Sequence, residues 1–187
     1  MAWTVREVKS PLTAEMLRPF SGDEGVVYLN SMLSDSDFMR LSDWMRDYPQ
    51  LGLRVGDGLN DIEFLRFFPF IRHFGAAVAH QWLHSIDGLR HLSDNLESLD
   101  LGHTRPMLDL TILGRFPRLK QLKLEGQTKG VAVISRLTAL EDLTLPIDNA
   151  AGPIAAATAH RAQGARHQAR RNERSEPAAK NRKTSIP

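Results

Sequence analysis

The sequence predicts an α/β fold in which short parallel strands alternate with tight returns, forming a solenoid of about four to five coils with its sheet on the concave face. The first observation is the stretch FPRLKQLKLEG, residues 116–126, where leucines lie at 119, 122 and 124. Residues three apart share one side of a tight helical turn, and residues two apart share one face of a strand. A segment whose spacing changes from three to two therefore enters by a turn and continues as a strand.

The second observation is that this pattern recurs. Counted from Leu119, apolar residues lie at −9, −6, −3, 0, +3 and +5, and the same six offsets from Ile71 and Leu140 are also apolar. Chance would fill all eighteen positions with a probability of about 10⁻⁷ in a chain that is 42% hydrophobic. A fourth unit, anchored at Leu96, needs one extra residue, and a degraded fifth unit is anchored at Gln50.

The strand segments LESLDLG, LKQLKLEG and LEDLTL resemble the LxxLxL segments of leucine-rich-repeat proteins. The resemblance covers roughly residues 41–147, and the unit length of 21 to 25 residues is typical of that family. It implies a solenoid whose concave face binds a protein partner. One departure concerns the asparagine that usually bonds to the turn backbone, which is replaced here by Ala79, Thr104, Gln127 and Asp148.

The elements upstream of the repeats follow a different pattern. Residues 1–25, which contain Pro11 and Pro19, are expected to be a loosely ordered arm. Residues 26–48 are expected to be a strand–helix unit, with a strand over 26–29 and a helix capped by Ser34 or Asp35. Phe38, Leu41 and Met45 would share one face of that helix, with Trp44 adjacent, and the repeats would then occupy residues 49–147.

The C-terminal segment has a different composition. Residues 146–187 hold eight Arg or Lys and three Asp or Glu, whereas the chain as a whole has 24 and 22 and a formal net charge of +2. The remaining 145 residues therefore carry 16 basic and 19 acidic groups. Few large aliphatic residues and no aromatic residue occur after Leu145, so residues 148–187 are expected to be a disordered basic tail. The abrupt change also suggests a truncated repeat protein that lacks its C-terminal cap.

Composition restricts the cellular context and the chemistry. The chain of 187 residues has no cysteine, which excludes disulfides and thiolate metal ligands. Its first 20 residues lack the apolar core of a signal peptide, and no stretch reaches the ~18 apolar residues of a membrane span. A cytoplasmic protein without a membrane segment is expected.

The candidate partner-binding residues lie between the strand leucines, where side chains would point out of the sheet. They form three lateral rows across neighbouring strands. The predicted positions are Arg72, Glu97, Lys120 and Glu141 in the first row, His73, Ser98, Gln121 and Asp142 in the second row, and Asp100, Lys123 and Thr144 in the third row. Strands lie about 4.8 Å apart, so the charges are expected to pair laterally and to cancel, which disfavours a nucleic-acid ligand. No aromatic residue occurs in these rows, so no strong binding hot spot is predicted there.

Other motifs do not indicate catalysis or a cofactor. His80 and His84 have the i, i+4 spacing of zinc ligands on a helix, but HQWLH has Gln where a metalloprotease has its general-base Glu. GDG at 56–58 and GQTKG at 126–130 lack the order of a phosphate-binding loop, and no nucleophile motif is present. No metal, no cofactor and no enzymatic activity are predicted.

The leading functional hypothesis is a non-catalytic protein–protein interaction module that binds its partner on the concave repeat face. One alternative is nucleic-acid or acidic-surface binding by the basic tail, through Arg166 to Lys183. This alternative is weakened because the tail has no aromatic side chain for base stacking.

Overall fold

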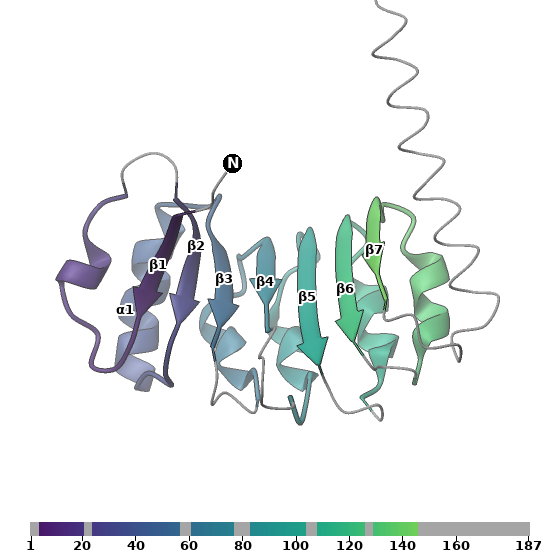
Figure 1. Cartoon of the computed structure of the whole chain (residues 1–187), viewed down its shortest axis with the longest axis horizontal. Coiled ribbons are helices and arrows are strands. Elements are labelled where there is room, and N and C mark those ends of the chain that lie inside the picture. Colours follow the sequence, from purple (N-terminus) through teal and green to yellow (C-terminus); the bar gives the residue numbers. More distant parts are fainter. Residues whose placement is uncertain are drawn as a thin grey trace, which may run out of the picture.

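The computed structural model describes residues 4–20, 24–56, 61–76, 83–103, 108–125 and 129–145. Its centre is one parallel sheet of seven strands, which follow one another in chain order (Figure 1). The strands are β1 (Thr4–Val8), β2 (Glu24–Leu29), β3 (Gly52–Val55), β4 (His73–Gly75), β5 (Ser98–His103), β6 (Gln121–Glu125) and β7 (Asp142–Thr144). The α/β class and the parallel sheet predicted from the sequence are therefore confirmed.

The connections between strands are short helices. They are the 3₁₀-helices η1 (Glu15–Leu17), η2 (Glu63–Phe67), η3 (Asp87–His91), η4 (Leu110–Arg115) and η5 (Val131–Arg136), together with the α-helix α1 (Asp35–Arg46). Figure 1 shows α1 and the later 3₁₀-helices behind the sheet, so one sheet face is covered and the other is open. We call the uncovered side of the sheet the open face.

The change of leucine spacing has the predicted structural basis. In the return before β6, Phe116 N–H donates to the Leu113 carbonyl at 3.0 Å and Leu119 N–H donates to the Phe116 carbonyl at 3.1 Å. These i to i−3 bonds place residues three apart on one side. Leu122 and Leu124 then alternate along β6 and point to that same side, so the return and the strand share one core.

The hydrophobic core follows the repeated offsets closely. All twelve positions counted from Ile71 and Leu119 are at most 3% exposed. Among the six positions counted from Leu140, Ile134 and Leu137 are buried. The other four are only partly buried: Val131, Leu140, Leu143 and Leu145. The difference arises because β7 ends the sheet, and no strand of the described residues pairs with its outer side.

The prediction of a loosely ordered arm over residues 1–25 is wrong for the part that the structure describes. Residues 4–8 form β1, which pairs in parallel with β2 from Thr4–Glu24 to Val8–Leu29. Apolar periodicity did not reveal this strand because Arg6 occupies a core-facing position in it. A charged residue at that position obscures the alternation on which strand prediction depends.

Arg6 is buried because its guanidinium group finds partners within the fold. It is 8% exposed and donates to three backbone carbonyls in the segment after β1, those of Met16 (3.3 Å), Arg18 and Pro19 (3.5 Å). Its Cζ also lies 3.9 Å from the centre of the Phe20 ring. A buried charge is tolerated only when it is paired in this way, and the pairing fixes residues 9–20 against β1.

The segment predicted as a strand–helix unit over residues 26–48 contains most of β2, which begins earlier, at Glu24, and the whole of α1. The Ser34 hydroxyl accepts from Asp37 N–H at 3.2 Å and caps α1, whose Phe38, Leu41 and Met45 side chains are buried. The degraded repeat unit needs a correction of one residue. Gln50 is exposed, and Leu51, at 1% exposure, occupies the buried anchor position.

Several sequence predictions concern residues outside the described ranges. The predicted disordered basic tail, residues 148–187, is among them, and so is the end of the chain on which the truncation hypothesis depends. The positions that replace the family asparagine also lie outside: Ala79, Thr104, Gln127 and Asp148.

Replacement of Leu122 by aspartate tests whether this side chain of β6 points into the core. Leu122→Asp places a charge in the core, so we expect the free energy of unfolding to fall by about 4 kcal/mol or more. Lys120→Ala, which removes an exposed side chain two residues earlier, should change it by less than about 1 kcal/mol. Urea denaturation followed by circular dichroism measures both. Equal tolerance of the two changes would show that the assigned direction is wrong.

A second prediction concerns the packing of η3 on η2. A Cβ atom at Gly88 would lie 2.1 Å from the Ile62 carbonyl oxygen, which is backbone and cannot rotate away. Gly88→Ala should therefore lower the thermal midpoint, at a cost of about 1–3 kcal/mol or more. Gly114→Ala is the matched control, because its Cβ would meet only a Val133 methyl group at 3.2 Å. Similar midpoints for the two variants would contradict the close approach of η3 to η2.

Candidate functional site

The strand register aligns the open-face residues in lateral rows. The second row contains Val5, Val26, Gly52, His73, Ser98, Gln121 and Asp142, and the third row contains Glu7, Tyr28, Arg54, Gly75, Asp100, Lys123 and Thr144. The first row precedes the strands. There Glu97, Lys120 and Glu141 each donate a backbone N–H to the carbonyl of the preceding member, starting from Arg72, at 2.7 to 2.8 Å. All eleven residues singled out from the sequence thus lie in the predicted rows.

The predicted lateral charge pairing is present around Glu97 and Asp100, whereas no ion pair of the described residues joins Lys120 to Glu141. In the first row the Glu97 carboxylate lies between the Arg72 guanidinium group and the Lys120 ammonium group, the latter at 3.0 Å. In the third row Asp100 lies between Arg54 at 3.1 Å and Lys123 at 3.9 Å. Each carboxylate is therefore flanked by two cations from neighbouring strands, and these charges largely satisfy one another within the face.

Lys123 has a second partner on its own strand. Its ammonium group lies 2.9 Å from the Glu125 carboxylate. This hydrogen bond, together with the attraction of Asp100, raises the pKa of Lys123 above its ordinary value, against the opposing effect of partial burial. Lys123 therefore stays charged and paired with these two carboxylates.

Arg54 is a member of the third row that sequence reasoning missed. Its lateral neighbour on β4 is Gly75, and a Cβ atom there would lie 2.9 Å from the Arg54 Nε atom. The side chain passes over the glycine and reaches Asp100 on β5, two strands away. Arg54 stands four residues after Gln50, the offset of the other third-row members, but Asp47 and Gln50 interrupt the apolar pattern of its unit, so the predicted rows did not include it. A glycine beside charged row positions was an available signal.

His73 lies in the second row, near two charged residues of the first row, Arg72 and Lys120. It is half-buried, and burial lowers its pKa below the ordinary value of 6.5. The nearby charges of Arg72 and Lys120 lower it further. At neutral pH His73 is thus an uncharged imidazole that offers one hydrogen-bond donor and one acceptor on the open face.

A groove of about 890 Å³ lies on the open face and extends across β1 to β6. Small or apolar residues line the end nearest β1, including Val5, Val26 and Gly52, and Val5 is 50% exposed. Polar residues line the other end, namely His73, Ser98 and Gln121. The second row therefore changes from apolar to polar along the groove.

The groove also contains an aromatic residue, because the rows continue beyond the predicted positions onto β1, β2 and β3. Tyr28 on β2 is the third-row neighbour of Arg54. It leans over Gly56, where a Cβ atom would lie 2.7 Å from the tyrosine hydroxyl oxygen. The alternation in EGVVYLN, which places Val26 and Tyr28 on one face, was the signal that could have found it.

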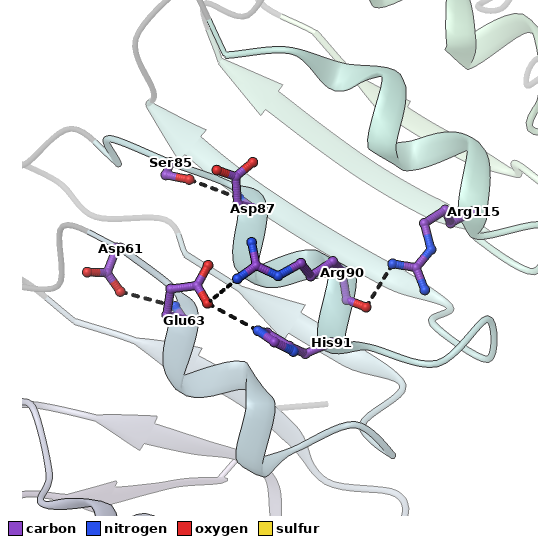
Figure 2. Close-up of polar contacts among 7 residues, drawn as sticks. All are labelled: Asp61, Glu63, Ser85, Asp87, Arg90, His91 and Arg115. Carbon is purple, nitrogen blue, oxygen red and sulfur yellow. Dashed lines mark hydrogen bonds and ion pairs between the residues drawn. The ribbon is translucent and has the colours of Figure 1, made fainter.

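The helical side of the sheet has its own polar network (Figure 2). The Glu63 carboxylate of η2 accepts from Arg90 at 2.9 Å and contacts His91 Nε2 at 3.1 Å, both on η3. Arg115 of η4 then donates to the Arg90 carbonyl at 2.7 Å. These contacts connect three successive returns and give His91 a structural role.

Metal ligation has no support among the described residues. His84 is exposed, and His80, its partner in the i, i+4 spacing, lies outside the described ranges together with Trp82. Within those ranges no group of three or more His, Asp or Glu side chains gathers as metal ligands would. GDG and GQTKG, at 56–58 and 126–130, are also only partly described.

No protein-family model matches the chain, and no curated protein matches it. Among the helices of the described residues, none has the length and apolar character needed to cross a membrane. The function must therefore be argued from the open face itself.

The lowered pKa of His73 predicts a pH dependence of stability. The unfolded chain takes up a proton at this histidine near pH 6.5 and the folded chain does so only at lower pH, so acidification favours unfolding. The compared quantity is the difference in the free energy of unfolding between wild type and His73→Gln. This difference (wild type minus variant) should fall as the pH is lowered from about 8 to about 5. Urea titrations across this range measure it. A difference that stays constant with pH would contradict the lowered pKa.

Proposed function

We propose that the chain is a leucine-rich-repeat solenoid and acts as a non-catalytic module that binds a protein partner on the open, concave face of its sheet. The observation that carries this proposal is the groove of about 890 Å³ on that face. Support for the solenoid comes from the buried apolar offsets around Ile71 and Leu119 and from the chain-order pairing of the strands.

The chemistry of the face favours binding over catalysis. Its charged residues between β3 and β6 are held in lateral ion pairs, and its polar groups lie in straight rows instead of converging on one reacting atom. The groups available to contact a partner include Tyr28, the exposed apolar surface of Val5 and the neutral imidazole of His73. Aromatic and apolar surface of this kind supplies much of the free energy of protein association.

The scaffold beneath the groove is suited to association. Every strand that lines it rests on fully buried residues, for example Leu29, Leu53 and Leu99, each at most 1% exposed. A preformed surface loses little conformational entropy when a partner binds, so more of the contact energy appears as affinity. The same rigidity keeps the rows in register.

The test is affinity capture with the full chain and two alanine variants. Tyr28→Ala removes the aromatic side chain from the groove, whereas Met39→Ala removes an exposed side chain from α1. We expect to capture a protein partner whose binding persists in high salt and after nuclease treatment. Its affinity for Tyr28→Ala should be about tenfold or more lower than for wild type, and its affinity for Met39→Ala should equal that for wild type. Titration calorimetry with the purified partner measures both affinities. Equal binding by the two variants would refute the open face as the site, and circular dichroism checks that each variant folds.

A further inference from the structure

We propose that the groove receives an extended peptide segment of the partner, which places an arginine or lysine side chain against Glu7 and Tyr28 and an apolar side chain on Val5, Val26 and Gly52. This inference depends on the proposed binding function and specifies the chemistry of the partner. It arises from the one groove residue in the third row whose charge has no counter-charge.

Glu7 differs from every other charged member of that row. Arg54, Asp100 and Lys123 are all joined in ion pairs. Glu7 is exposed at the β1 end of the groove, and among the described residues no ion pair or hydrogen bond reaches its carboxylate. A groove with one uncompensated carboxylate attracts a cationic group.

The arrangement of the neighbouring cations explains why Glu7 has no internal partner. Its lateral neighbour is Tyr28, and the next residue in the row, Arg54, turns away over Gly75 to reach Asp100. Arg6 points to the core side and binds carbonyls there. Lys9, two residues further along, makes no ion pair with Glu7 within the described part of the chain.

Tyr28 adds a second recognition element beside this carboxylate. It lies directly opposite Glu7 in the β1–β2 register, and its ring is held over Gly56. A guanidinium group can form a bidentate pair with a carboxylate while it stacks on an aromatic ring, and an ammonium group can use the same two contacts less fully. The pair therefore suits a basic side chain, arginine above all.

The rest of the groove fits an extended chain. Five strand intervals of about 4.8 Å separate β1 from β6, which gives a length of about 24 Å, or roughly seven extended residues. Next to Glu7 the second row offers the exposed Val5 side chain and the half-buried Val26 side chain for an apolar side chain, and Gly52 beside them adds no side chain that would fill the groove. Further along, His73, Ser98 and Gln121 offer hydrogen-bonding groups for the peptide backbone.

The experiment is a selection of phage-displayed random twelve-residue peptides on the immobilised full chain. Selected peptides should carry Arg or Lys within about two positions of a large apolar residue. As synthetic peptides they should bind Glu7→Gln roughly tenfold more weakly than wild type, because the isosteric change removes only the charge. Glu15→Gln, on exposed η1 away from the groove, is the matched control and should bind as wild type does. Selection on Glu7→Lys should replace the basic residue with Asp or Glu.

The outcomes separate this inference from the function on which it depends. Peptides that lose binding with Tyr28→Ala but carry no basic residue and ignore Glu7→Gln would overturn the inference alone. A failed selection would do the same, because it would leave a folded partner as the occupant. Peptides that are indifferent to both groove variants would count against the whole face. A synthetic peptide with the sequence of residues 160–174 is also tested. If it binds as tightly as the selected peptides do, the groove is assigned to the chain's own tail, and the proposal of a separate partner is overturned.

Discussion

The in-register pairing of each short strand with its neighbours in sequence is the constraint on which the rest of the structure depends. Strands of three to six residues have few backbone bonds of their own, so neighbours must align position by position. Alignment brings inward side chains together as a continuous core and outward side chains together as rows. The burial of the leucines, the pairing of Asp100 with its flanking cations and the shape of the groove all follow from this one register.

The sequence predicted those parts of the fold that apolar spacing encodes, which includes every row position from Arg72 to Thr144. It failed where one residue broke the spacing. Arg6 in a core position hid β1, and the polar residues Asp47 and Gln50 obscured the repeat unit that contains Arg54. The groove could not be predicted, because it depends on where side chains are small and on how far the rows extend across β1 and β2.

The two ends of the sheet are completed differently. At the β1 end, Arg6 and Phe20 join the segment after the strand to α1, where the Phe20 ring lies 5.1 Å from that of Trp44. At the β7 end, Leu143 and Leu145 remain partly buried, although the equivalent Leu122 and Leu124 on β6 are at most 2% exposed. The apolar core is therefore closed more completely at the β1 end than at the β7 end.

The salt bridge that crosses Gly75 has a consequence for cooperativity. When strands pair only with sequence neighbours, stability resembles a chain of nearest-neighbour terms, and such a chain separates most easily at its weakest junction. The β3–β4 junction, with two aligned positions, has the shortest register of the sheet. Arg54 and Asp100 connect the strands on either side of β4 and so add a second-neighbour term at this point. This salt bridge therefore opposes separation of the sheet at β4, by about 1 kcal/mol or less for a pair whose arginine is about half exposed.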